Sequence, residues 1–132
     1  MKIDHIGIAV RSLDDALKMY RDVIGLTVSG YDDVAEQGVR VAMLSAGDSR
    51  IELLEPLGDH SPIEKFMAKR GEGIHHIAIA VDNIEEALGR FKAAGLRLID
   101  ETPRQGAHGT RIAFVHPSAN HGVLLELVEH VQ

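Results

Sequence analysis

The chain contains no cysteine and no tryptophan, and aromatic residues make up only 4% of its 132 residues. Without cysteine it can form no disulfide, offer no thiolate to a metal and use no thiol nucleophile, so any metal must be held by histidine, aspartate or glutamate. Such ligands favour zinc, cobalt, nickel, iron or manganese. The scarcity of aromatic rings disfavours a binding protein whose cleft is lined by aromatic side chains.

Basic residues are also in the minority. There are 14 Lys and Arg against 20 Asp and Glu, which gives a formal net charge of −6 and a pI near 5.7. This balance provides no basic footprint for DNA or RNA. No apolar run approaches the roughly 20 residues that a membrane span needs, and the first residues do not resemble a targeting sequence. We therefore expect a soluble, cytoplasmic protein with no nucleic-acid or membrane partner.

The most informative feature of the sequence is an internal repeat. Residues 3–10 read IDHIGIAV and residues 74–81 read IHHIAIAV, which places the second copy 71 residues later (74 − 3). The match continues beyond this segment, because residues 12–17 align with residues 83–88 at the same offset. The length and the 45% hydrophobic content suit one domain with its own core. We predict a single domain over residues 1–132 that is built from two tandem modules.

Both modules have the same expected order of elements. The first strand of each alternates bulky and small side chains, which is the period of a β-strand. Ser12 and Asn83 are N-cap residues with an acid three positions on, and they begin amphipathic helices that run to Gly25 and Gly95. Alternating runs follow at residues 38–44, 50–54, 111–115 and 123–128. The predicted fold class is therefore α+β, with two βαβββ modules.

A short helix is expected to connect the modules. Module one spans about residues 1–57, and module two spans about residues 73–130. Between them, Ser61 is a good N-cap and Pro62 suits the first helical position, so a connector helix is predicted at about residues 61–71.

The small face of each first strand carries a histidine. If the bulky residues pack under the helix, His5 points to the other side with only glycine and alanine beside it, and His76 does the same in module two. Glu52 and Glu126 each lie in the last strand of a module, where an unpaired carboxylate would be costly to bury. We predict that these four side chains surround one first-row divalent cation.

Simpler roles are open to the same residue types. A lone histidine that faces small residues is more often structural than a ligand, and the alternative for Glu52 and Glu126 is an ion pair with Arg50, Arg111 or another base. The symmetric placement of all four residues favours the metal site. The other histidines are expected in loops, in the tail or facing away from the cavity, with His116 ambiguous. They are His60, His75, His108, His121 and His130.

Several motifs point to one family. They are DHIGIAV at residues 4–10, EQGV at 36–39, ELLEPL at 52–57, GIHHIA at 73–78, RIAF at 111–114, the His-Pro pair at 116–117 and GVLLEL at 122–127. Together they cover nearly the whole chain, and they resemble the methylmalonyl-CoA epimerases of the vicinal oxygen chelate superfamily. The resemblance implies paired βαβββ modules in a curved mixed sheet around a metal site, and it implies a homodimer.

The resemblance also implies an activity and roles for residues. The implied reaction interconverts the (R) and (S) forms of methylmalonyl-CoA by proton removal next to the thioester, through an enolate. The family's metal ligands fall on His5, Glu52, His76 and Glu126, with cobalt favoured and nickel, manganese or zinc as alternatives. Some members have glutamine at the position of Glu52, so this site carries one more negative charge. The family's proposed base falls on Glu36, and Glu126 is the candidate second acid/base group.

Other functions share parts of this pattern. Glyoxalase I, a lactoylglutathione lyase, uses two histidines and two carboxylates in the same fold, although the EQGV segment and the His-Pro turn favour the epimerase. A drug-sequestering binding protein needs the aromatic cleft that this composition disfavours. An extradiol dioxygenase needs an open metal position that a carboxylate at Glu52 would occupy. Basic candidates for the CoA phosphates are Lys65, Lys69, Arg70, Arg104 and Arg111.

Overall fold

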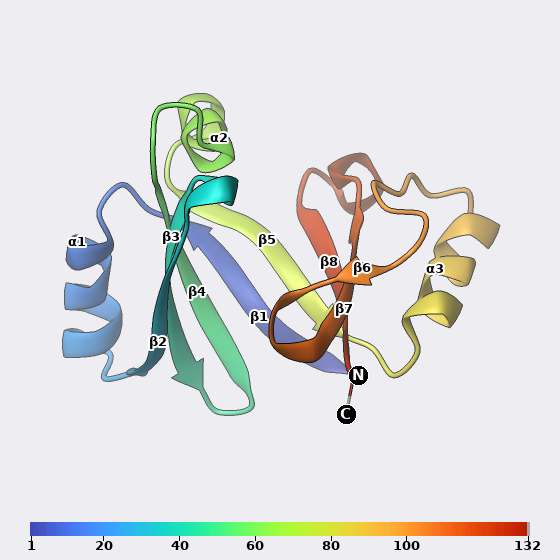
Figure 1. Cartoon of the computed structure of the whole chain (residues 1–132), viewed down its shortest axis with the longest axis horizontal. Coiled ribbons are helices and arrows are strands. Elements are labelled where there is room, and N and C mark those ends of the chain that lie inside the picture. The colour runs from blue at the N-terminus through green and yellow to red at the C-terminus, as the bar shows by residue number, and fades with distance from the viewer. Residues whose placement is uncertain (132) are drawn as a thin grey trace. The chain divides into compact units, whose positions relative to one another are not determined.

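The element order repeats as predicted. A computed structural model describes residues 1–131. The first copy contains β1 Lys2–Ala9, α1 Leu13–Leu17, β2 Thr27–Val34, β3 Val39–Ala46 and β4 Ser49–Pro56, and the second contains β5 Gly73–Ala80, α3 Ile84–Ala93, β6 Arg104–Gln105, β7 Thr110–Val115 and β8 Leu124–His130 (Figure 1). Between them lies α2 Pro62–Arg70. The α+β class and the connector helix are confirmed.

The chain divides into two compact units. The first unit is His5–His75, and the second unit is Met1–Asp4 together with the chain from His76 onward. β1 therefore begins in the second unit and continues in the first, while β5 begins in the first and continues in the second. The first four residues, which the repeat assigns to module one, belong to the unit built from module two.

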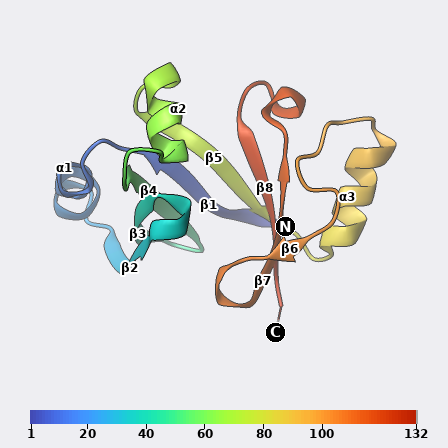
Figure 2. The same cartoon turned by 45° about the horizontal axis from the view of Figure 1, so that its top comes forward.

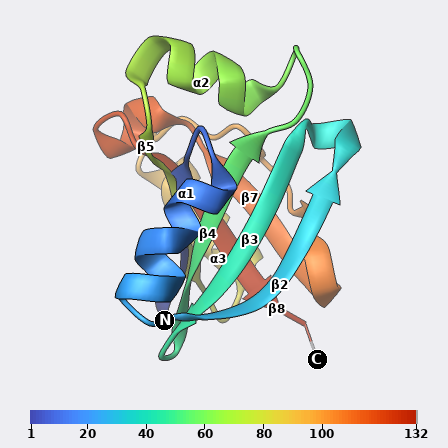
Figure 3. The same cartoon turned by 90° about the vertical axis from the view of Figure 1, so that its left-hand side faces the viewer.

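In the first unit the strand order is β2-β3-β4-β1. β1 runs parallel to β4, and the other pairs are antiparallel. The bulky face of β1 packs as its alternation predicts, because Val10 joins Leu13 and Leu17 of the α1 helix and Leu53 of β4 in one buried cluster. Figure 3 shows α1 along one side of these strands.

The second unit has the equivalent arrangement. Its strand order is β5-β8-β7-β6, with β5 parallel to β8. Ile84 and Leu88 of α3 pack with Val81 and Val115 in a buried cluster, and α3 contacts β7 and β8 (Figure 1). Thus α1 and α3 each pack on the strands of their own unit. Each covers the face to which the bulky side chains of the first strand point. No helix among residues 1–131 is long and apolar enough to cross a membrane.

Three side chains begin the helices as predicted. Ser12 Oγ accepts a hydrogen bond from Asp15 N at 3.2 Å, Asn83 Oδ1 accepts one from Glu86 N at 3.0 Å, and Ser61 Oγ caps α2. Such bonds satisfy amides that have no partner inside the helix.

The structure departs from the expected elements in two places. The first helix is α-helical only to Leu17 and continues as a π-helical segment, Lys18–Val23 (η1), in which Ile24 N donates to Met19 O at 2.8 Å. β2 was not located from the sequence, because nearly all of its side chains are exposed and its residues show no buried face. β6 has only two residues, which is too short for any period to show.

Candidate metal and catalytic site

The first unit brings His5 and Glu52 together. β1 and β4 are parallel with Gly7 opposite Glu52, so His5, two residues before Gly7, lies on the same face as the carboxylate. His5 Nε2 is 3.8 Å from Glu52 Oε1, and the two side chains are 9% and 18% exposed. This distance is too long for a direct hydrogen bond. It is close to the roughly 3.4 Å that separates two ligands of a tetrahedral ion when each is about 2.1 Å from it.

The second unit repeats this arrangement. β5 and β8 are parallel with Ala78 opposite Glu126, which places His76 and Glu126 on one face. His76 Nε2 is 3.6 Å from Glu126 Oε1, and the side chains are 8% and 10% exposed. Each unit therefore holds one buried imidazole beside one largely buried carboxylate. Imidazole nitrogen and carboxylate oxygen are donors suited to first-row divalent metals, so each pair fits half of a metal site.

Arg111, one of the bases considered as a partner for Glu126, bonds to other acids. The Arg111 guanidinium donates instead to Glu85 and Glu129, with Nη1 at 3.0 Å from Glu85 Oε1 and 3.3 Å from Glu129 Oε2. These acids lie on α3 and on β8. The carboxylate that the metal hypothesis requires is thus left beside His76, and the nearby base is engaged elsewhere.

Glu36 lies in the first unit, on a short 3₁₀ turn, Ala35–Gln37 (η2), between β2 and β3. Its side chain is exposed and makes no hydrogen bond or ion pair within residues 1–131. The register pairs Met43 with Glu52 and Val39 with Pro56, so the turn lies beyond the end of β4, at least about 13 Å along the strand from Glu52. The structure does not bring Glu36 into direct contact with His5 or Glu52.

Two further glutamates have equivalent roles that the sequence did not reveal. Glu55 Oε1 accepts a hydrogen bond from Leu13 N at 2.9 Å, and Glu129 Oε1 accepts one from Ile84 N at 2.9 Å. Each ties the last strand of its unit to the first residue of the helix. Their spacing of 74 residues (129 − 55) equals that of Glu52 and Glu126, and this offset was the signal that could have identified them.

The chain matches the Glyoxalase/Bleomycin resistance protein/Dioxygenase superfamily over residues 4–114. It belongs to that superfamily. YqjC of Bacillus subtilis, an uncharacterized protein, is 45% identical over 97% of this chain and 91% of its own length. The mitochondrial methylmalonyl-CoA epimerase of Dictyostelium discoideum is 42% identical over 97% of this chain and 78% of its own.

The fold is also similar to that of a solved methylmalonyl-CoA epimerase structure. A variant of the Streptomyces coelicolor methylmalonyl-CoA epimerase in complex with 2-nitronate-propionyl-CoA superposes with a TM-score of 0.88 at 41% identity, covering 99% of this chain and 95% of the other. The resemblance to methylmalonyl-CoA epimerases that the motifs indicated is thus confirmed, and it covers nearly the whole chain.

Among the basic candidates for a CoA phosphate, Arg111 is committed to its two carboxylates. Arg104 lies over the ring of Phe114, with its guanidinium carbon 5.2 Å from the ring centroid. Lys65 and Lys69 are exposed on α2 and lie four residues apart, on one side of the helix. Arg70 is also exposed on this helix, so α2 carries three of the five candidates for an anionic group arriving from solvent.

The structure assigns roles to two histidines that were not predicted as ligands. His116 Nδ1 accepts a hydrogen bond from Ser118 N at 3.0 Å, so this ambiguous residue caps a turn. His130 was expected to be a solvated tail residue, but its Nε2 lies 2.6 Å from the buried Asp4 Oδ1. His130 is exposed as expected, but the sequence did not reveal this contact, which forms because the start of β1 lies beside the end of β8 in the second unit.

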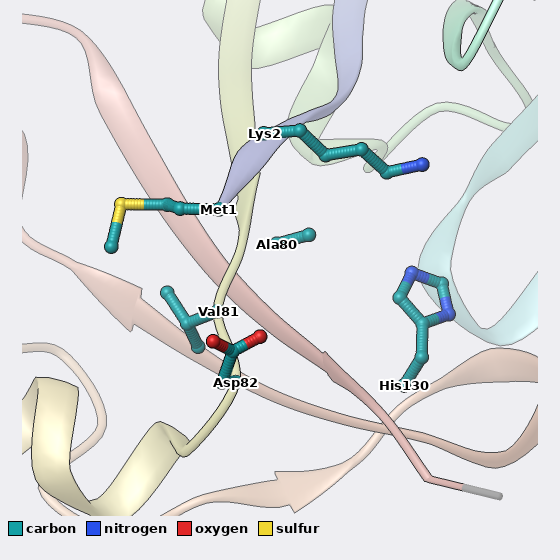
Figure 4. Close-up of a pocket in the computed structure, with 6 residues that line it drawn as sticks. All are labelled: Met1, Lys2, Ala80, Val81, Asp82 and His130. Carbon is teal, nitrogen blue, oxygen red and sulfur yellow. The ribbon is translucent and has the colours of Figure 1, made fainter.

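The second unit also has a pocket of about 280 Å³. Its lining residues are Met1, Lys2, Ala80, Val81, Asp82 and His130, drawn in Figure 4. Most of these side chains are exposed, and none is a proposed metal ligand or base. The pocket therefore offers no counterpart to the buried His–Glu pairs.

Proposed function

We propose that this protein is a metal-dependent methylmalonyl-CoA epimerase that interconverts the (R) and (S) forms of its substrate. The observation that carries the proposal is the duplicated buried pair, His5 with Glu52 and His76 with Glu126. It occurs in a chain that is 42% identical to a methylmalonyl-CoA epimerase over 97% of its length. We propose that both pairs bind the same divalent ion, cobalt first, with nickel, manganese or zinc as alternatives.

The chemistry explains why such a ligand set is useful. Removing the proton from a carbon between a thioester and a carboxylate produces an enolate, whose charge gathers on the thioester oxygen. When bound, a divalent ion supplies Lewis-acid stabilisation of that charge, worth several kcal/mol. His5 and His76 would supply imidazole nitrogens to the ion, while Glu52 and Glu126 would supply carboxylate oxygens that offset its charge.

Epimerisation requires that a proton leave one face of the carbon and that a proton return to the other. We assign the first role to Glu36, whose carboxylate accepts the proton from one face. Its exposed side chain is accessible to a substrate that enters from solvent. We assign the opposite face to Glu126, the second candidate carboxylate for proton transfer.

The substrate is a CoA thioester, and its phosphates need cationic groups. The three basic residues of α2 are our candidates, because Arg111 is engaged by Glu85 and Glu129. We further propose that the enzyme is a homodimer. Sedimentation equilibrium tests this, and a mass near the 14.4 kDa of one chain would contradict it.

The test of function is a metal analysis of purified protein combined with two assays. Protein stripped of metal and reloaded with cobalt should interconvert (R)- and (S)-methylmalonyl-CoA, and it should exchange the proton of the methyl-bearing carbon in deuterated water. The second assay uses the hemithioacetal of methylglyoxal and glutathione. Turnover of the hemithioacetal without epimerisation would instead make the protein a lactoylglutathione lyase, and binding of an apolar drug without turnover or metal would indicate a sequestering protein.

A further inference from the structure

The turn that carries Glu36 has a counterpart in the second unit. η2 precedes β3, and a similar short turn, Ala107–Gly109 (η3), precedes β7. Gly38 and Gly109 are 71 residues apart (109 − 38), which is the offset of the repeat, and both have positive φ, 63° and 74°. The two turns are therefore equivalent positions of the duplicated fold, and they can be compared directly.

In both turns the glycine carbonyl accepts a backbone hydrogen bond, but within residues 1–131 only that of the first unit is also clamped by a side chain. Gly38 O accepts hydrogen bonds from Ser61 Oγ at 2.5 Å and from Leu57 N at 2.9 Å. A Cβ at Gly38 would come within 3.1 Å of Ser61 Cα and 3.2 Å of Leu57 O, so the backbone of the turn is packed directly against the segment leading into α2 (Figures 2 and 3). Gly109 O accepts only the equivalent backbone hydrogen bond within residues 1–131, from Val131 N at 3.3 Å, and a Cβ at Gly109 would meet only Val131 O, at 3.7 Å.

The clamp uses a single hydroxyl for two purposes. Ser61 is 1% exposed, and its Oγ accepts a hydrogen bond from Ile63 N at 3.1 Å, which caps α2. Capping needs only an acceptor, so the one O–H donor of the serine is available, and it donates to Gly38 O. One buried side chain therefore joins the start of α2 to the end of the Glu36 turn.

An ion pair closes the other side of the turn. Asp33 on β2 and Arg40 on β3 are cross-strand partners that flank it. Arg40 Nε lies 2.9 Å from Asp33 Oδ1, and its Nη2 lies 3.3 Å from Asp33 Oδ2. This bidentate geometry restrains the two strands at the base of the turn.

These contacts matter because Glu36 has no hydrogen bond or ion pair of its own within residues 1–131. Its carboxylate is placed only by the backbone that carries it, and a proton-transfer base must be held in a narrow range of positions. We infer that Ser61 is a positioning residue for Glu36: its hydrogen bond to Gly38 O holds the turn in the place from which Glu36 serves the substrate. This inference rests on the proposed function.

The test compares two serines that cap helices. Ser61→Ala removes the cap of α2 and the clamp, whereas Ser12→Ala removes the cap of α1, a hydroxyl with no contact to the turn. Ser61→Ala should lose more thermal stability than Ser12→Ala, because the buried Ser61 hydroxyl makes two hydrogen bonds and the Ser12 hydroxyl makes one, and both variants are assayed where circular dichroism shows them folded. Ser61→Ala should lower kcat by up to about 10²-fold, with KM and metal affinity unchanged. Ser12→Ala should leave kcat unchanged, and Ser61→Thr, which keeps the hydroxyl, should retain most of it.

A second measurement reports on the turn without catalysis. Backbone ¹⁵N relaxation of residues 35–38 should show larger fast motions in Ser61→Ala than in wild-type protein or Ser12→Ala. Equal kcat in the two alanine variants, or unchanged relaxation in Ser61→Ala, would overturn the inference while leaving the epimerase assignment intact. Wild-type protein with no epimerase activity would overturn the proposed function, and the positioning role in catalysis would fall with it.

Discussion

Asp4 and His130 come from nearly opposite ends of the chain, yet Asp4 Oδ1 lies 2.6 Å from His130 Nε2. The aspartate side chain is 4% exposed and the histidine side chain is 51% exposed. A buried carboxylate is stabilised only if its lost hydration is replaced by hydrogen bonds or charge. The pair therefore anchors the start of β1 to the end of β8.

Replacing His130 by alanine should weaken this anchor. The buried Asp4 loses a short hydrogen bond, and the free energy of unfolding should fall by about 1–3 kcal/mol, measured by urea denaturation. His60→Ala is the control, because His60 is exposed and has no hydrogen bond or ion pair within residues 1–131. Equal stability of the two variants would show that the contact contributes nothing.

The Glu129 carboxylate should contribute to the stability of the second unit. Glu129→Ala removes the acceptor for Ile84 N and one partner of Arg111, so we expect a loss of about 1–2 kcal/mol. Glu129→Gln keeps an amide oxygen for Ile84 N and should lose less. Glu101→Ala, a change of an exposed acid, should have little effect, and a Glu129→Ala protein as stable as that control would refute the role.

The pair of Glu85 and Arg111 predicts a pH dependence. The Arg111 guanidinium hydrogen-bonds to the Glu85 carboxylate and holds its pKa below the ordinary value. Because the folded-state pKa is lowered, the stabilisation is present above the unfolded pKa of about 4.3 and is lost as the pH falls through the folded pKa. In Arg111→Gln, the pKa of Glu85 should return toward its ordinary value in an NMR titration. An unchanged midpoint would assign the shift to another cause.

The proposed metal ligands should act together. Replacing His5, His76 or Glu126 by alanine should lower metal affinity by more than about tenfold, since even the loss of an outer partner of a ligand costs about that much. The apo domain should stay folded, because each change leaves the apolar clusters intact. Metal content after dialysis, measured by mass spectrometry, tests this against His60→Ala. Full metal retention by all three ligand variants would end the four-ligand proposal.

Glu36→Gln tests the base directly. The amide keeps the size of the side chain but cannot accept the proton, so turnover should fall by about 10² to 10⁴ while metal and substrate still bind. In deuterated water, exchange should be lost on the face that Glu36 serves. Asp32→Asn, which neutralises an exposed acid on β2, should leave turnover unchanged. An active Glu36→Gln enzyme would move the search for the base to Glu126.

Local patterns predicted much of this fold. The caps at Ser12, Ser61 and Asn83 and the helix-facing side of each first strand depend on residues within a few positions of one another, and the repeat is visible by comparing two segments of the sequence. β2 could not be predicted in this way, because a strand with almost no buried side chain has no alternation of polarity to detect.

The sequence by itself determined the two βαβββ copies, and it placed His5 and His76 on the small faces of their first strands, since strand periodicity is a local property. Only the tertiary structure decided which charges meet. It paired Arg111 with Glu85 and Glu129 instead of Glu126, joined Ser61 to the Glu36 turn, and brought Asp4 to His130. These contacts join residues that are 18 to 126 positions apart in the sequence. Several residues of the same charge could form each charged contact, and the packing of the strands and helices decides which one comes within bonding distance.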